Sequence, residues 1–230
     1  MNPKNITDIF FDLDHTLWDF DRNSKLAFYR VFSKHNIKTS VNEFIEVYEP
    51  INFQYWKMYR EERIDKLGLR RGRFMDAFKP FGINFSTEEL DQLASSYIDE
   101  LPKDNHLFNG AMDVLNYLSE KKYKMHIITN GFGEVQHLKL KNSKIDIFFN
   151  TVTTSEEVGV KKPNPLVFEK ALQKAEVLAK HSIMIGDTFE ADILGAEAVG
   201  MDTLFYNYRR EEPPHNYKII NEIPEIKIHL

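Results

Sequence analysis

Apolar strand-like runs and helical segments alternate regularly along the second half of the chain, and this alternation limits the possible folds more than any other feature. The strand-like runs lie at residues 123–128, 148–153, 182–185 and 202–206, and the helical patterns at residues 111–121, 134–142, 165–176 and 191–199. Such alternation is typical of βαβ units, which predicts an α/β fold with a doubly wound, Rossmann-like parallel sheet. An apolar run at residues 6–13 predicts a further buried strand of the same sheet.

A helical block separates that first strand from the others. Between about residues 21 and 102 the apolar residues recur at helical spacing, and we find no convincing strand pattern there. Pro50 is predicted to kink or divide one of these helices, and Ser86 with Glu89 three residues later matches a capping box at the start of another. The sequence therefore predicts an α/β core interrupted by an α-helical bundle. The predicted limits are residues 1–17 and 98–230 for the core and residues 18–97 for the insert.

Charge and composition exclude several classes of function. The chain has 30 Lys and Arg residues against 35 Asp and Glu residues, a net charge of −5, so it lacks the basic field expected of nucleic-acid-binding proteins. The absence of cysteine excludes disulfides, thiolate metal sites and cysteine nucleophiles. No run approaches the roughly 20 apolar residues that cross a bilayer, and residues 1–5 do not begin a signal peptide. We therefore predict a cytoplasmic protein without a nucleic-acid or membrane partner, as a monomer or weak homodimer. Arg70, Arg71 and Arg73 are predicted to form a solvated helix face.

Candidate functional residues follow the predicted strands at their carboxyl ends. Ligands of an open parallel sheet bind just beyond these ends. The residues found there are Asp12, Asp14, Thr129, Asn130, Lys162, Gly186, Asp187 and Asp192. Carboxylates crowded together repel one another unless a cation joins them, and a hard set of oxygen ligands selects Mg²⁺. The pattern therefore predicts a Mg²⁺ cofactor beside one lysine and one threonine hydroxyl.

A site of this composition suits phosphoryl transfer. Asp12, held beside Mg²⁺, can attack a phosphoryl group to give an aspartyl-phosphate. Lys162 and the ion neutralise charge on the phosphoryl oxygens, and the Thr129 hydroxyl can hold another of them. Asp14 lies two residues further on and therefore on the same side of an extended segment. From there it can protonate the leaving oxygen and later activate water.

Four short motifs resemble, in this order, those of the haloacid dehalogenase-like phosphatase superfamily. They are Asp12-Leu13-Asp14-His15-Thr16, Thr129-Asn130-Gly131, Lys162-Pro163 and Gly186-Asp187 through Asp192. The resemblance spans essentially the whole chain, because the helical insert is similar to the C1-type cap domain of that superfamily. The longer run from Phe11 to Phe20 is similar to the branch of pyrimidine 5′-nucleotidases. This resemblance implies a small phosphate ester as the partner, with a nucleoside 5′-monophosphate as the expected substrate.

The resemblance implies roles for the four acidic residues of these motifs. Asp12 is expected to be the nucleophile and, through its other oxygen, a metal ligand. Asp14 is expected to be the general acid and base and to give its backbone carbonyl to the ion. Asp187 is the third protein ligand of the metal. Asp192 matches a position that supports the ligands from behind rather than binding the ion.

The remaining motif residues are expected to bind the substrate. Thr129 and Lys162 match the residues that hold the phosphoryl group and serve catalysis, with Asn130 beside them. Two lysines are adjacent, and the motif places the functional one directly before proline, which favours Lys162 and keeps Lys161 as the alternative. Trp18 follows the first motif into the insert and is the best candidate to stack on a nucleobase.

Other functions stay open on the same residues. A phosphosugar phosphatase or mutase shares both acids of the first motif. A metal-independent haloacid dehalogenase shares the fold and the nucleophile but departs at the second acid, where Asp14 is present here. Phosphonate cleavage would need a Schiff-base lysine in the insert, and nothing marks one. A phospho-accepting receiver module has a similar pocket but gives no reason for the insert or for Asp14.

Overall fold

The computed structural model describes residues 6–212 and 216–230. It divides the chain into two compact units, which we call the core (Met1–Phe20 with Asn105–Leu230) and the insert (Asp21–Asp104). Residues 1–5, on which part of the signal-peptide prediction depends, lie outside the described residues. Among the helices of the described segments, none is both long enough and apolar enough to cross a membrane.

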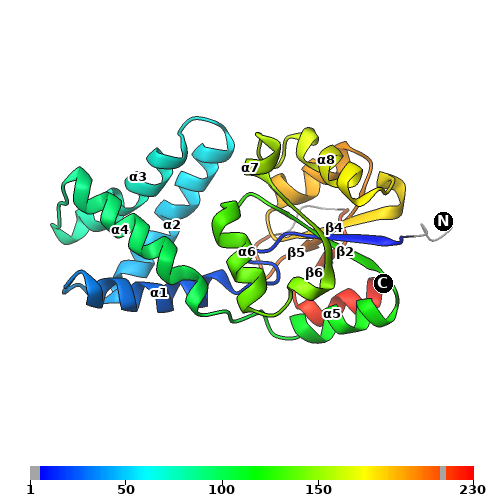
Figure 1. Cartoon of the computed structure of the whole chain (residues 1–230), viewed down its shortest axis with the longest axis horizontal. Helices are drawn as coiled ribbons and strands as arrows, with labels where there is room; N and C mark the ends of the chain where they lie inside the picture. Colours follow the sequence, from blue (N-terminus) through cyan, green and yellow to red (C-terminus); the bar gives the residue numbers. More distant parts are fainter. Residues whose placement is uncertain (1–5, 213–215) are drawn as a thin grey trace. The chain divides into compact units, whose positions relative to one another are not determined.

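The core is built on a parallel sheet of six strands in the order β3-β2-β1-β4-β5-β6 (Figure 1). The strands are β1 (Asp8–Phe11), β2 (Lys124–Thr129), β3 (Phe149–Thr154), β4 (Ser182–Gly186), β5 (Asp202–Tyr206) and β6 (Ile219–Ile220). Strand β1 lies between β2 and β4 and pairs in parallel with both. It is shorter than the predicted run at 6–13, because a tight turn follows it. In that turn the Leu13 carbonyl accepts hydrogen bonds from the backbone N–H groups of Leu17 (3.0 Å) and Trp18 (2.9 Å).

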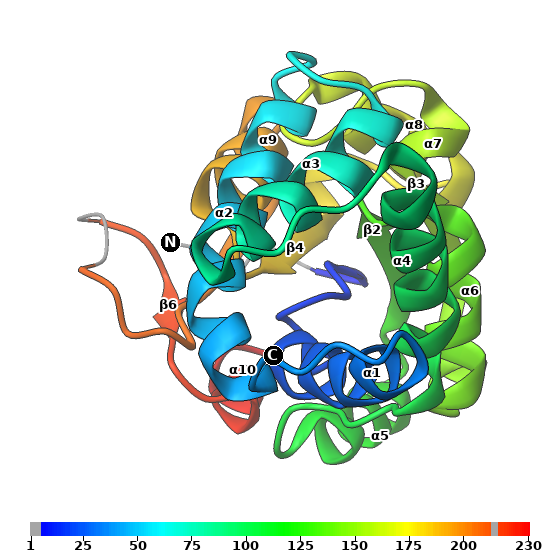
Figure 2. The same ribbon diagram turned by 90° about the vertical axis from the view of Figure 1, so that its left-hand side faces the viewer.

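Helices cover both faces of this sheet, which confirms the doubly wound prediction. Helices α8 and α9 lie on one face, and α5 and α10 lie on the other (Figures 1 and 2). The helices of the core are α5 (Ala111–Glu120), α6 (Gly133–Asn142), α7 (Ser155–Val158), α8 (Pro165–Ala175), α9 (Gly195–Ala198) and α10 (Ile226–His229). Short 3₁₀ turns lie at Asp146–Phe148, Ala179–His181 and Ile223–Glu225. Under α8, Phe10, Ile128, Phe168 and Met184 belong to one buried apolar cluster.

The predicted helix at residues 191–199 forms in a modified way. Its first part is a π-helical turn, Phe189–Leu194, and only Gly195–Ala198 is α-helical. The turn contains Asp192, whose carboxylate accepts a hydrogen bond from the backbone N–H of Thr188 (3.0 Å). A π-helical turn inserts an extra residue into the helix and is frequent at functional sites. The π-helical turn therefore gives the Asp192 carboxylate a position that a regular α-helix would not give it.

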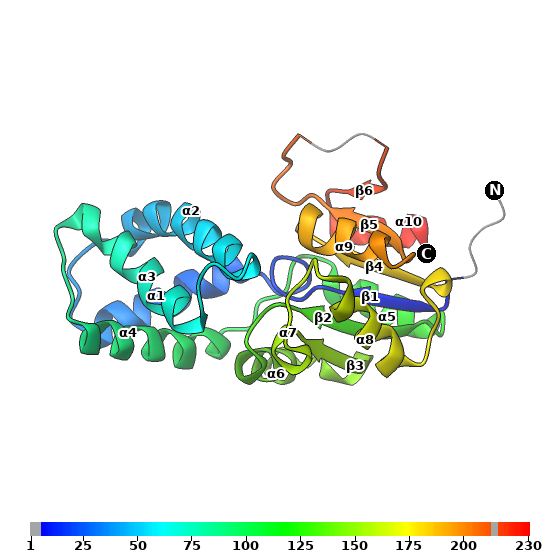
Figure 3. The same cartoon turned by 90° about the horizontal axis from the view of Figure 1, so that it is seen from above.

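The insert is a helical bundle, as the sequence predicts, and helices α1 to α4 can be followed in Figure 3. Its elements are α1 (Phe20–Lys34), α2 (Val41–Arg60), α3 (Lys66–Phe78), α4 (Thr87–Glu100) and the 3₁₀ turns Lys79–Phe81 and Leu101–Lys103. Helix α2 continues through Pro50 as one helix, so the proline does not divide it. The capping box of α4 is present: Ser86 Oγ accepts from the N–H of Glu89 (3.2 Å), and Glu89 Oε2 accepts from the N–H of Ser86 (2.7 Å).

Aromatic residues fill the interior of the insert. The ring of Phe28 lies at the centre, with centroid distances of 4.6 Å to Tyr97, 4.8 Å to Tyr48 and 5.0 Å to Phe44. All four side chains are essentially inaccessible to solvent. Because edge-to-face and stacked aromatic pairs add to the free energy of apolar burial, this cluster stabilises the bundle.

The prediction that Arg73 lies on a solvated face of α3 is wrong. Its side chain is buried, donates a hydrogen bond to Asn52 Oδ1 (3.0 Å) and lies 5.2 Å from the centroid of the Tyr97 ring. Arg71, two residues earlier, is partly exposed and pairs with Asp91 of α4. Arg73 is buried because it lies on the side of α3 that faces α2, a property that charge alone does not reveal.

The insert begins at residue 21 and not at the predicted residue 18, and it ends at residue 104 and not at the predicted residue 97. At the second boundary, Arg30 of α1 forms an ion pair with Glu100 (2.8 Å) and donates a hydrogen bond to the backbone carbonyl of the same residue (3.0 Å). These contacts keep the end of α4 in the bundle. The chain therefore leaves the insert only after Asp104.

Candidate active site

The predicted residues come together at the carboxyl ends of the three central strands of the core. Asp12 directly follows β1, Thr129 ends β2 and Asp187 directly follows β4. Since β1 lies between β2 and β4, these ends are adjacent in the sheet. This is the edge at which ligands of open parallel sheets bind.

Lys162 joins the acidic residues of the site. Its ammonium donates hydrogen bonds to Asp12 Oδ1 (2.6 Å), Asp192 Oδ1 (2.6 Å) and the backbone carbonyl of Ile128 (2.8 Å). An ammonium has three donors, so these contacts fix its position completely. The lysine is 2% exposed. Lys162, and not its neighbour Lys161, therefore supplies the charge beside Asp12.

Three carboxylates crowd around this single ammonium. Oxygen atoms of Asp12, Asp187 and Asp192 lie within 4.8 Å of one another. Burial raises the pKa of Asp12 to about 7 against the opposing charge of Lys162, and the neighbouring Asp192 carboxylate contributes to this rise. Burial, together with Asp12 and Asp192, also holds the pKa of Asp187 well above its usual range. In return Asp12 and Asp192 raise the pKa of Lys162, although burial alone would lower it. The site therefore has an excess of negative charge, and its all-oxygen donor set fits a divalent cation such as Mg²⁺.

Asp192 is already engaged through both of its oxygens. Oδ1 accepts from Lys162, and Oδ2 accepts from the N–H of Thr188. Gly186 makes this arrangement possible, because a Cβ at that position would collide with the Asp192 carboxylate. The supporting role of Asp192 behind Asp12 and Asp187 stays a prediction.

Asn130 holds the lysine segment in place. Its Nδ2 donates to the backbone carbonyl of Lys162 (3.0 Å), and its Oδ1 accepts from the backbone N–H of the same residue (2.8 Å). The predicted contact of Asn130 with the substrate remains a prediction, since both ends of its amide face the Lys162 backbone here. The observed geometry gives it a positioning role.

The Thr129 hydroxyl is oriented as a donor. Its oxygen accepts hydrogen bonds from Gln136 Nε2 (2.8 Å) and from the backbone N–H of Gly131 (3.1 Å). A hydroxyl has two acceptor lone pairs and one O–H donor, so its remaining capacity is donation. An anionic oxygen is the kind of ligand that such a hydroxyl can serve.

Asp14 is held by two residues that the sequence analysis did not identify. Lys139 Nζ lies 2.6 Å from Asp14 Oδ1, and Gln136 Nε2 lies 3.0 Å from Asp14 Oδ2. Both belong to α6, three residues apart, and therefore project from the same helix face. In the sequence, only the i, i+3 spacing of these two polar residues could have indicated a shared role. That spacing is also common on solvated helices, so it does not identify a site.

The comparisons with known proteins agree with this geometry. Residues 9–206 match the family described as haloacid dehalogenase-like hydrolase. The chain belongs to that family. As a haloacid dehalogenase-like hydrolase it is an enzyme, and the resemblance inferred from the four motifs is confirmed.

Two similar relatives are named as phosphatases or nucleotidases. The chain is 33% identical over 200 residues to the pyrimidine 5′-nucleotidase PynA of Streptococcus pneumoniae, covering 86% of this chain and 83% of that protein. It is 32% identical over 209 residues to a glyceraldehyde 3-phosphate phosphatase of Pyrococcus abyssi, covering 87% of this chain and 81% of the other. The structure of the putative hydrolase YfnB of Bacillus subtilis, described as bound to magnesium, has a TM-score of 0.88 at 27% identity and covers 97% of this chain and 98% of that one.

Trp18 of this haloacid dehalogenase-like hydrolase lies against the Asp14 site. Its side chain is fully buried, its Nε1 donates to Asn105 Oδ1 (3.3 Å), and the Lys139 ammonium lies 4.3 Å from its ring centroid. Stacking on a nucleobase stays a prediction, but Lys139 occupies one face of the ring. The observed contacts favour a supporting role for Trp18.

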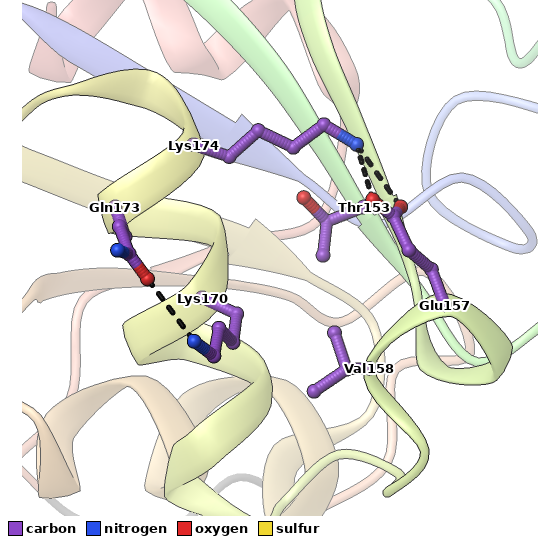
Figure 4. A pocket seen from close by; sticks show the side chains of 6 residues that line it. All are labelled: Thr153, Glu157, Val158, Lys170, Gln173 and Lys174. Atoms are coloured by element: carbon purple, nitrogen blue, oxygen red, sulfur yellow. Dashed lines mark hydrogen bonds and ion pairs between the residues drawn. The ribbon is translucent and has the colours of Figure 1, made fainter.

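One depression of the hydrolase core is lined by a different set of residues (Figure 4). It has a volume of about 340 Å³, and its lining includes Thr153, Lys170 and Lys174. Lys174 is already paired there with Glu157 at 2.8 Å. None of the residues of the candidate active site lines this depression. The catalytic assignment therefore rests on the carboxyl edge of the sheet.

Proposed function

We propose that the chain is a Mg²⁺-dependent phosphomonoesterase that acts through an aspartyl-phosphate on Asp12. The proposal rests on one observation: a buried aspartate that shares the Lys162 ammonium with a second acid, Asp192, next to a third, Asp187. Asp14, two residues after the nucleophile, provides the separate acid that phosphoryl transfer to and from a carboxylate needs.

In the first half-reaction, a carboxylate oxygen of Asp12 attacks phosphorus while the ester oxygen leaves. Asp14 gives a proton to that leaving oxygen. The Thr129 hydroxyl donates to a phosphoryl oxygen. The Lys162 charge stabilises the same oxygens, and a direct hydrogen bond from this lysine requires it to release one of its three present acceptors.

In the second half-reaction, water attacks the phosphorus of the aspartyl-phosphate and the bond to Asp12 breaks. Asp14, now deprotonated, takes the proton of the attacking water, so the two steps return the enzyme to its starting state.

The carboxylates of Asp12 and Asp187, with the backbone carbonyl of Asp14, are the groups that would hold Mg²⁺. When bound, the ion supplies positive charge that neutralises the phosphoryl oxygens and lets the nucleophile approach a dianion. The excess of carboxylates over ammonium groups supports this assignment.

For the substrate we infer a nucleoside 5′-monophosphate, with pyrimidine nucleotides preferred. The similarity to a protein named pyrimidine 5′-nucleotidase supports this choice, together with the run from Phe11 to Phe20. A second candidate is a phosphosugar or triose phosphate, which the similarity to glyceraldehyde 3-phosphate phosphatase supports. A metal-independent dehalogenase remains a weaker alternative, because it gives no role to Asp14 as an acid.

A panel of substrates tests these alternatives. We would incubate the chain with pyrimidine and purine nucleoside monophosphates, hexose phosphates, glyceraldehyde 3-phosphate and 2-chloropropionate, each with Mg²⁺ and with EDTA. We expect released phosphate with Mg²⁺ only, and the highest kcat/KM with pyrimidine nucleotides. Phosphate release led by sugar or triose phosphates would overturn the nucleotide assignment, and chloride release in EDTA would overturn the phosphatase.

A further inference from the structure

Helix α6 places a buried lysine on the carboxylate of Asp14. The side chain of Lys139 is 2% exposed, that of Asp14 is 20% exposed, and their nearest atoms, Nζ and Oδ1, are 2.6 Å apart. The other oxygen of Asp14 accepts from Gln136 Nε2 at 3.0 Å. One helix therefore binds both oxygens of the carboxylate.

We propose that Lys139 is a positioning residue for Asp14: it fixes the orientation in which this carboxylate exchanges protons with the leaving group and with water. The inference rests on the proposed phosphatase function and adds a residue outside the four motifs. Lys139 acts through Asp14 and is not itself placed on the reacting atoms.

The contacts leave Asp14 able to do chemistry. A carboxylate offers about four lone pairs, and the two hydrogen bonds from α6 use one on each oxygen. At least one lone pair on each oxygen is then left for a proton or a water molecule. Because a charge-assisted hydrogen bond is stronger than a neutral one, Lys139 contributes more to fixing the carboxylate than Gln136 does.

Two aromatic rings also contact the Lys139 ammonium and help to fix its position. Its ammonium lies 4.3 Å from the centroid of the Trp18 ring and 5.3 Å from that of Phe20. Burial of an ammonium is costly unless it is paired, and here a carboxylate and two aromatic faces compensate for the lost water. A lysine with surroundings this specific can hold a carboxylate more precisely than an exposed one.

Gln136 extends the arrangement to the phosphoryl-binding hydroxyl. The same Nε2 group donates to Asp14 Oδ2 and to Thr129 Oγ1. Gly131 leaves room for this side chain, since a Cβ at that position would collide with the Gln136 amide. Helix α6 thus orients the proton-exchanging acid and the hydroxyl donor together.

The test compares Lys139→Met, which keeps the aliphatic stem, with Lys139→Arg, which keeps the charge, and with Lys141→Met, an exposed lysine of the same helix. The substrates are phenyl phosphate and p-nitrophenyl phosphate, which have similar shapes but need different amounts of proton assistance. For Lys139→Met we expect kcat on phenyl phosphate to fall about 100-fold, with KM changed less than about threefold. Phosphorylation by p-nitrophenyl phosphate should fall much less. Lys139→Arg should recover kcat to within about tenfold of the wild type, and Lys141→Met should match the wild type.

A double-mutant cycle separates positioning from general stability. In an Asp14→Asn background the added Lys139→Met change should leave the rate of phosphoenzyme formation from p-nitrophenyl phosphate unaltered, because no carboxylate remains to be positioned. The double variant also avoids an unpaired buried charge, so it can be measured even if Lys139→Met alone fails to fold.

Three results would overturn the inference alone: Lys139→Met with wild-type kcat on phenyl phosphate, equal losses in the rate of phosphoenzyme formation from the two esters, or an undiminished loss of that rate in the Asp14→Asn background. Each of these requires that the wild type hydrolyses the esters. A wild-type chain that releases no phosphate from either ester with Mg²⁺ present would refute the proposed function, and the inference with it.

Discussion

Replacing Asp12 by asparagine should remove a pH dependence of stability from the metal-free protein. Burial raises the pKa of Asp12 from 3.8 to about 7 in the folded chain. Between these values the folded state binds more protons than the unfolded state. The contribution of Asp12 to the free energy of unfolding is therefore greatest at low pH and is lost as the pH rises from about 4 to about 7.

The size of the effect follows from the two pKa values. Integrated from about pH 5 to about pH 8, the difference in bound protons amounts to roughly 2–3 kcal/mol for Asp12. Asp187 titrates in both proteins, but Asp12 is one of the causes that raise its pKa. Removing Asp12 therefore also reduces the pH dependence that Asp187 gives to the free energy of unfolding. The pH dependence of the wild type should exceed that of Asp12→Asn by at least this range.

The assay is urea unfolding in EDTA at the two pH values. Of the two tryptophans, Trp18 lies in the core and Trp56 in the insert, so a Trp56→Phe background makes fluorescence report on the core alone. We expect the wild type to lose about 2–3 kcal/mol more than Asp12→Asn between the two pH values. The matched control is Glu169→Gln, an exposed acid of the same unit, which should follow the wild type. Parallel pH dependences of wild type and Asp12→Asn would refute the reasoning.

Two further predictions concern packing and charge. Phe28→Ala should destabilise the insert by roughly 3–5 kcal/mol, because its ring pairs with five other buried aromatic rings, and Trp56 fluorescence during urea unfolding measures this. A loss below about 1 kcal/mol would show that the cluster repacks. Lys162→Met should lower kcat for phosphate release by about 1000-fold or more, while Lys161→Met should stay within about threefold of the wild type; equal losses would contradict the assignment of Lys162.

The arrangement of the sheet could be predicted because its information is local. Buried strands such as β4 and β5 are short apolar runs between helical patterns, and their limits differ little from the predicted ones. The site residues could be predicted for a related reason. In a parallel sheet, a polar residue directly after a strand has only one edge to occupy, so Asp12, Thr129 and Asp187 had to meet.

The roles of several helical residues could not be predicted, because they depend on which helix face is buried. Arg73 and Lys139 look like surface charges in the sequence, yet both side chains are buried against specific partners. The π-helical turn that contains Asp192 likewise carries a long-range contact, the hydrogen bond from Lys162 to the Asp192 carboxylate. Such contacts join segments far apart in the chain and leave no periodic signal.

The central claim is that Asp12 forms a covalent phosphoryl intermediate. The most direct measurement uses Asp14→Asn with p-nitrophenyl phosphate and Mg²⁺, an acid quench, and intact-mass and peptide analysis. The phenolate leaves without much acid assistance, whereas hydrolysis of the intermediate still needs the missing base, so the adduct should accumulate. The account predicts a phosphoryl adduct on the peptide that contains Asp12 and none in Asp12→Asn. Absence of the adduct, or its location on Asp187, would contradict the account.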